Sequence, residues 1–274
     1  MGFGMARQIA GSTRAATLTL FAAVSLLAAS LLAASPDDLK AEDAPPLSPQ
    51  CDVPSSSIAA PAPLPNVTAT LETRKTIRVL AIGSSSTYGV GASSGSKNYP
   101  AQLTDILERA LKGVNIEIIN RGVSGEVAKT TAERLRVEVA LTHPDLVLWQ
   151  LGTNDALARV PVEEFEDTVT STIQWLKENK IDVVLVGLQY TARFARDDNY
   201  AAIRDALRRI AAQQNILYVR RFEAMRYISS VRNAPIVAND DLHLNDLGYH
   251  CMAEHIAHAV IANLFVRRFR PPTN

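Results

Sequence analysis

Between residues 77 and 265, short apolar runs alternate five times with stretches of helical periodicity. Short continuous apolar runs are typical of strands that are buried on both faces, as in parallel sheets. Strands that alternate with helices predict an α/β domain, in which right-handed crossovers place helices on both faces of a five-stranded parallel sheet. The expected strands cover 77–82, 114–119, 146–151, 183–188 and 216–219.

The first 35 residues read as a targeting segment. Arg7 and Arg14 precede an uncharged run over 15–34 that is rich in alanine and leucine. This is the pattern of an export signal, and at roughly 20 residues the run is also long enough to cross a bilayer uncleaved. We therefore expect a signal peptide or an N-terminal membrane anchor over 1–35. Either one predicts a domain outside the cytoplasm, periplasmic or extracellular.

Residues 36–75 are rich in proline, alanine and serine, which predicts an extended spacer. A single folded domain is expected over 76–268, followed by a short tail over 269–274. The two cysteines, Cys51 and Cys251, are too far apart for a zinc finger or a thioredoxin motif. Cys251 is either a buried thiol on the last helix or, in an oxidising compartment, the disulfide partner of Cys51.

Reactive side chains follow the expected strands. Ser85 comes after the first strand, Gly125 after the second and Asn154 after the third, while Asp240 and His243 precede the last helix. Since the carboxyl ends of parallel strands share one edge of a sheet, we expect these residues to converge there.

Such a set is suited to acyl transfer. His243 would take the proton of the Ser85 hydroxyl, and Asp240, three residues before the histidine, would orient the imidazole. The backbone N–H groups of Ser85 and Gly125 and the side chain of Asn154 would stabilise the oxyanion.

Other interpretations of the same residues exist. Asp241 is an alternative orienting carboxylate, although its spacing from His243 fits less well. Asp240, Asp241 and His243 could also hold a metal, but no further strong ligand accompanies them, and we expect neither a metal nor a cofactor. The 28 basic residues balance the 28 acidic ones, which is unlike the basic surface of a nucleic-acid-binding protein.

Four segments resemble the signature blocks of the SGNH (GDSL) hydrolase superfamily. The resemblance places Ser85 at the nucleophile, Gly125 and Asn154 at the oxyanion positions, and Asp240 and His243 in the triad. It implies a flavodoxin-like three-layer α/β/α sandwich and esterase or lipase activity without a metal. One departure is Ser84, where the family usually has aspartate. The matching segments are 83–87, 120–125, 152–155 and 240–243.

The resemblance does not fix the substrate. The expected export and the absence of a large apolar insertion favour small acyl groups, such as O-acetyl on a polysaccharide. Lysophospholipase or thioesterase activity is an alternative within the family. The altered first block also leaves open a non-catalytic relative that binds glycans in the same cleft. The expected partners are therefore a small-molecule or polysaccharide ester, with membrane attachment only through the N-terminal segment.

Overall fold

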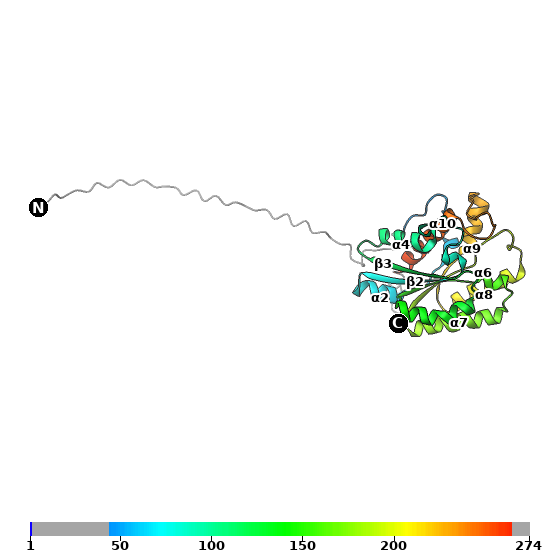
Figure 1. The fold of residues 1–274 in the computed structure, drawn as a ribbon, viewed down its shortest axis with the longest axis horizontal. Helices are drawn as coiled ribbons and strands as arrows, with labels where there is room; N and C mark the ends of the chain where they lie inside the picture. Colours follow the sequence, from blue (N-terminus) through cyan, green and yellow to red (C-terminus); the bar gives the residue numbers. More distant parts are fainter. Residues whose placement is uncertain (2–43, 265–274) are drawn as a thin grey trace, which may run out of the picture. The chain divides into compact units, whose positions relative to one another are not determined.

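The computed structural model describes Met1 and residues 44–264. The described residues form one sheet, with strands in the order β1-β6-β5-β4-β2-β3 and helices on both faces (Figure 1). Apart from Met1, the expected signal peptide or anchor over 1–35 lies outside the described residues, as does the tail over 269–274. Among the described helices, none has both the length and the apolar character needed to cross a membrane.

The sheet has six strands, one more than expected. Five of them run parallel, whereas β1 (Ala59–Ala60) pairs antiparallel with β6. The α/β three-layer prediction is thus confirmed, and the prediction of a five-stranded, wholly parallel sheet is wrong. A strand of two residues inside a proline-rich segment leaves no alternating pattern to recognise. The parallel strands are β2 (Thr76–Gly83), β3 (Asn115–Gly122), β4 (Leu146–Gln150), β5 (Asp182–Val186) and β6 (Leu217–Val219).

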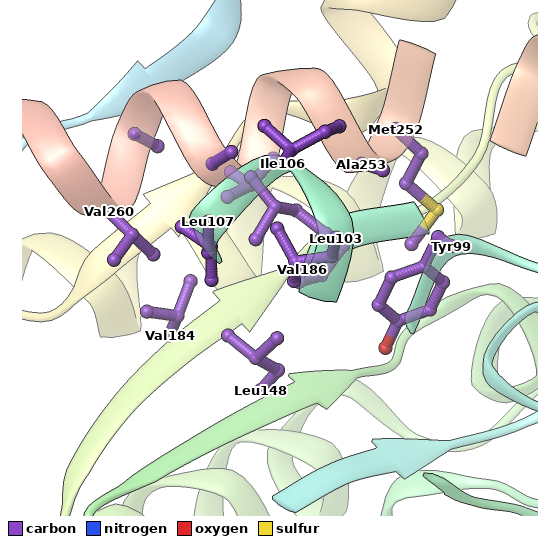
Figure 2. Close-up of a cluster of buried hydrophobic side chains, with 14 of the residues drawn as sticks. Tyr99, Leu103, Ile106, Leu107, Leu148, Val184, Val186, Met252, Ala253 and Val260 are labelled. Carbon is purple, nitrogen blue, oxygen red and sulfur yellow. The ribbon is translucent and has the colours of Figure 1, made fainter. Parts of the chain in front are cut away.

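Both faces of the sheet are apolar, because successive side chains of a strand point to opposite sides. In β2, Val79 and Ala81 enter one core cluster, whereas Leu80 and Ile82 enter the other. The first cluster is covered mainly by α4 (Tyr99–Ala110) and α10 (Asp246–Leu264), which pack on β4 and β5 (Figure 2). The second is covered by α5 (Ala128–Thr142), α7 (Val162–Glu178) and α8 (Asp198–Gln213).

Residues 44–75 are not an extended spacer. They contain α1 (Ser55–Ile58), β1 and α2 (Pro65–Thr73), and their apolar side chains are buried in the core. The carboxylate of Asp182 accepts from the backbone N–H groups of Asn66 and Val67, both at 2.9 Å, and so satisfies the first turn of α2. Proline suits such a first turn, because its missing N–H is not needed there. The folded unit therefore begins well before residue 76.

The segment before α1 is fastened to α10. Cys51 and Cys251 form a disulfide, which decides between the two interpretations of Cys251. The carboxylate of Glu254 accepts from the backbone and the hydroxyl of Ser48, both at 3.0 Å, and His255 Nε2 lies 2.7 Å from the carbonyl of Cys51. Because this segment covers the side of α10 that faces away from the sheet, α10 is buried around most of its circumference.

Short helical elements follow the strands at the carboxyl edge of the sheet. After β6 the chain forms α9 (Arg221–Tyr227), which continues into a π-helical turn, η4 (Ile228–Arg232). The others are α3 (Ser85–Tyr88), η3 (Gly95–Lys97) and α6 (Thr153–Leu157).

Candidate active site

Ser85 is the first residue of α3, directly after β2. Its half-buried side chain lines a cavity of about 340 Å³ at the carboxyl edge of the sheet. The turn that leads to it needs glycine at position 83, where an added Cβ would lie 2.5 Å from the carbonyl oxygen of Gln150. The tight packing of β2 against β4 therefore fixes where the Ser85 hydroxyl emerges.

The structure brings Ser85, His243 and Asp240 together. His243 Nε2 lies 3.1 Å from the Ser85 Oγ, and His243 Nδ1 lies 2.5 Å from an Asp240 oxygen. The other Asp240 oxygen accepts from the backbone N–H groups of Leu242 and His243, at 3.0 and 2.9 Å. Asp241 is exposed and, at φ +55°, in the left-handed region; it is Asp240 that contacts the imidazole.

The hydrogen bond with His243 lowers the pKa of Asp240 to about 2. The carboxylate therefore stays ionised throughout the neutral and mildly acidic range. An ionised acceptor at Nδ1 holds the proton on that nitrogen and leaves Nε2 free to accept from the Ser85 hydroxyl. The arrangement can thus raise the nucleophilicity of a serine. Within residues 44–264, no group of three or more His, Cys, Asp or Glu side chains is arranged to hold a metal ion.

Hydrogen-bond donors border the same cavity. Gly125 has φ +85°, and the space beside its Cα is open. Within the described part of the chain, the backbone N–H groups of Ser85 and Gly125 have no protein acceptor. The Asn154 side chain donates one hydrogen to the carbonyl of Glu126, at 2.8 Å, and keeps a second for a ligand. These groups are placed where a developing oxyanion could be stabilised.

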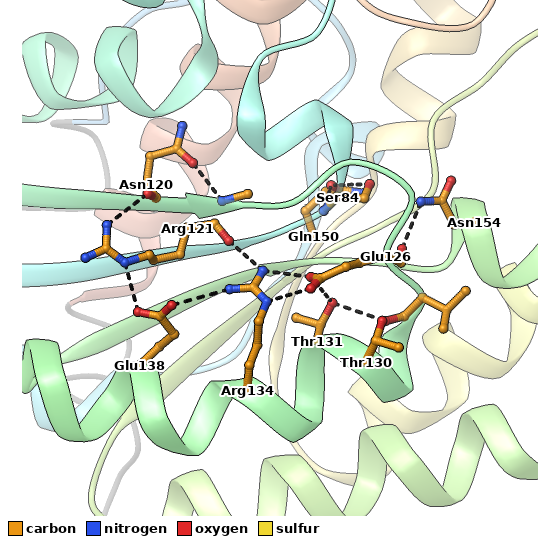
Figure 3. A network of polar contacts seen from close by, with 12 residues as sticks. Ser84, Asn120, Arg121, Glu126, Thr130, Thr131, Arg134, Glu138, Gln150 and Asn154 are labelled. Atoms are coloured by element: carbon orange, nitrogen blue, oxygen red, sulfur yellow. Dashed lines mark hydrogen bonds and ion pairs between the residues drawn. The ribbon is translucent and has the colours of Figure 1, made fainter.

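The loop that carries Gly125 is held by an ion pair (Figure 3). Arg134 donates through two nitrogens to the two carboxylate oxygens of Glu126, both at 2.7 Å, and Thr131 donates to the same carboxylate at 3.0 Å. Such a bidentate pair fixes direction as well as distance. The Glu126 carbonyl accepts from the Asn154 side chain. The ion pair between Arg134 and Glu126 therefore orients two candidate oxyanion donors, Gly125 and Asn154.

Gln150 anchors the loop after β2 at Ser84, the position where the family usually has aspartate. The Gln150 side-chain oxygen accepts from the Ser84 N–H and hydroxyl, each at 3.0 Å, and from the Thr87 hydroxyl at 3.3 Å. Gln150 is the last residue of β4, and its side chain is buried. A neutral acceptor on the neighbouring strand therefore holds Ser84, which has no carboxylate of its own.

Sequence reasoning missed a second buried network, centred on Gln189. Its amide nitrogen donates to the Leu242 carbonyl at 2.8 Å, and its oxygen accepts from Ser86 at 3.3 Å and from Arg221 at 2.8 Å. Gln189 thus joins the neighbours of Ser85 and His243. The positions of these residues in the chain could have indicated the network. Gln189 and Arg221 are polar, and they closely follow β5 and β6 at the carboxyl edge of the sheet.

Arg221 is buried without a carboxylate partner. Its side chain is 3% exposed, and within residues 44–264 no Asp or Glu forms an ion pair with it. One terminal nitrogen donates to Ser86 at 2.9 Å and to Gln189, while Nε and Nη1 have no partner among the described residues. Burial lowers the pKa of the guanidinium. An unneutralised cation near the candidate nucleophile would favour negative charge developing in the cavity.

We expect Asn154→Ala to lower kcat for ester hydrolysis by about 10²–10³-fold with little change in KM, because it removes a donor used mainly in the transition state. Steady-state kinetics on p-nitrophenyl acetate measures this. The matched control is Asn179→Ala, because Asn179 is exposed and bonds only within its own helix region. If Asn154→Ala kept the wild-type kcat, Asn154 would not be an oxyanion donor.

Known proteins resemble this chain in sequence and fold. A stretch of 100 residues is 27% identical to an arylesterase of Vibrio mimicus and covers 36% of this chain and 49% of that protein. The chain thus matches about half the length of this curated relative. A two-domain esterase active on acetylated mannans superposes with a TM-score of 0.64 at 18% identity, over 81% of this chain and 60% of the other.

An acetyl xylan esterase variant from Geobacillus stearothermophilus superposes with a TM-score of 0.60 at 21% identity, over 67% of this chain and 94% of the other. At these identities the structural likenesses establish the fold, which is that of GDSL-type hydrolases. The match of residues 50–264 to a family covers most of the chain. The protein therefore belongs to the Non-GDSL lipase-like family.

Proposed function

We propose that this protein is an exported serine esterase that removes small acyl groups, such as O-acetyl, from a polysaccharide. The observation that carries the proposal is the chain of contacts from Asp240 through His243 to Ser85, at 2.5 and 3.1 Å, on the wall of an open cavity. Ser85 is the proposed nucleophile, His243 the general base and Asp240 the orienting carboxylate. Ser85 N–H, Gly125 N–H and the Asn154 amide are the proposed oxyanion donors.

The proposed reaction has two halves. The Ser85 Oγ attacks the ester carbonyl while its proton moves to His243 Nε2, and the oxyanion donors stabilise the negative charge on the former carbonyl oxygen. Collapse expels the alcohol, which takes the proton from His243 and leaves an acyl-enzyme. Water then gives a proton to His243 and attacks the acyl group, and the second tetrahedral intermediate collapses to the carboxylic acid as the Ser85 Oγ takes the proton back from His243.

Three observations support a small acyl group and an exported protein. Among the described residues that line the cavity, Val90 and Leu242 are the only large apolar side chains, which suits a short acyl group better than a long alkyl chain. Two of the structural neighbours are described as acting on acetylated polysaccharides. The Cys51–Cys251 disulfide is of a kind that persists in oxidising compartments outside the cytoplasm.

A chain-length series tests the proposal. With p-nitrophenyl esters from acetate to dodecanoate, we expect kcat/KM to fall by about tenfold or more between acetate and octanoate, because only two large apolar side chains among the described lining residues, Val90 and Leu242, can contact a longer chain. Parallel assays without enzyme correct for spontaneous hydrolysis. A kcat/KM that rises with chain length would favour lysophospholipase or thioesterase activity instead. Glycan binding without turnover of any ester would indicate the non-catalytic alternative.

A further inference from the structure

A second cavity, of about 520 Å³, adjoins the catalytic one. Gln189 lines the catalytic cavity, and the residues that follow it, 190–193, line the second. Likewise, Leu242 and His243 line the catalytic cavity, and the residues that precede them, 240–241, line the second. The imidazole and carboxylate of the candidate triad therefore stand between two neighbouring cavities. The volume of the second lies within the range of small-molecule sites.

The second cavity holds a buried hydroxyl that has no partner. Thr191 is 5% exposed, and its Oγ1 forms no hydrogen bond with any described residue. Leaving such a group unpaired costs free energy, so an unpaired one in a native protein calls for an explanation. Thr191 lines the cavity, but its Oγ1 is closed off from solvent, so a ligand with hydroxyl groups supplies the missing hydrogen bond only after a shift of the loop that carries Thr191.

Other residues that line this cavity also carry hydroxyl groups. Ser229 and Ser230 belong to the π-helical turn η4, and Tyr190 is an aromatic residue next to Thr191 in the sequence. Turns of this type are rare and occur frequently at functional sites. Hydroxyl groups together with one aromatic ring suit a sugar, which has polar edges and an apolar face.

The charges in this cavity favour a neutral ligand. Arg193 contributes one positive charge, whereas Asp240 and Asp241 contribute two negative ones. Arg193 lies over the ring of Phe194, 5.1 Å from its centroid, and in residues 44–264 neither Arg193 nor Asp241 forms an ion pair. An excess of carboxylate disfavours phosphate and uronate groups.

We propose that this second cavity binds a neutral sugar unit next to the acylated one, on the alcohol side of the ester. The inference rests on the proposed function, because the departing alcohol accepts its proton from His243. The ring of His243 is 19% exposed, so a sugar chain can pass over it from the Ser85 side to the Asp240 side. The cavity thus makes the protein an esterase of oligomeric rather than monomeric sugars.

Thr191→Val tests the inference, since it keeps the shape of the side chain and removes only the hydroxyl. For an acetylated xylotriose we expect the variant to raise KM about tenfold with kcat unchanged. The lost hydrogen bond would stabilise the bound substrate and the transition state equally, so its removal weakens binding without slowing the chemical step. On p-nitrophenyl acetate the variant should match the wild type. Thr172→Val is the matched control, because Thr172 lines a separate cavity between α5 and α7. Ser230→Ala, at an exposed position, repeats the test without disturbing a buried site.

The outcomes separate the two proposals. If wild-type protein hydrolyses neither p-nitrophenyl acetate nor acetylated sugars, the proposed function fails. If it hydrolyses both, but Thr191→Val and Ser230→Ala leave KM for the acetylated trisaccharide unchanged, the sugar site is refuted. An equal rise in KM for both esters would show a structural role of Thr191 and would also refute it.

Discussion

Replacing Ser85 with alanine is expected to lower kcat for p-nitrophenyl acetate by at least about 10⁴-fold, because without the nucleophile only the oxyanion donors and substrate binding still accelerate the reaction. Thermal unfolding should be unchanged, since Ser85 is only half-buried and its side chain contacts His243 rather than the core. Stopped assays with purified protein, corrected for spontaneous hydrolysis, measure the residual rate.

Ser171→Ala is the control for Ser85→Ala. The Ser171 hydroxyl is exposed and donates only to carbonyls of its own helix, so its removal should leave kcat unchanged. Retention of more than a small fraction of the wild-type rate by Ser85→Ala would reject Ser85 as the nucleophile. Ser84 and Ser86 would then be tested in its place, although the structure turns both hydroxyls toward buried glutamines.

Removing the disulfide by Cys51→Ala together with Cys251→Ala is expected to lower the free energy of unfolding by about 2–5 kcal/mol. The bond closes a loop across a sequence separation of 200 residues, and long loops restrict the unfolded chain most. Urea denaturation monitored by circular dichroism gives the difference. Alanine is preferred to serine because both sites are buried.

Wild-type protein in the presence of a thiol reductant provides the comparison for the double variant. Both samples lack the cross-link, so their urea midpoints should lie close together and below that of the oxidised protein. Identical midpoints for all three samples would show that the covalent link adds nothing to the hydrogen bonds of Ser48 and His255.

The strands and helices of the α/β unit could be predicted because each has a local pattern. β2 and β4 are continuous apolar runs, and the stripe of Leu103, Ile106 and Leu107 in α4 repeats at helical spacing. The candidate site could be predicted for a related reason. Its residues directly follow strands or precede a helix, and topology alone brings those points to one edge.

The features that could not be predicted from the sequence depend on contacts between residues that are distant in sequence. Residues 44–75 show no periodic apolar pattern, and their conformation is fixed by packing against α10, pairing of β1 with β6, the disulfide and capping by Asp182. Gln150 and Gln189 are ordinary polar residues until the fold places Ser84 and Leu242 beside them. No local pattern distinguishes a buried arginine such as Arg221 from an exposed one.

The covalent link between Cys51 and Cys251 has a consequence for resistance to proteolytic cleavage. Every residue of the proposed catalytic apparatus, from Ser85 to His243, lies between the two cysteines in the sequence. A single cut in any surface loop within that interval leaves two pieces that are still joined through sulfur. The nicked molecule can then keep its shape and its reactive groups together, as separate fragments could not.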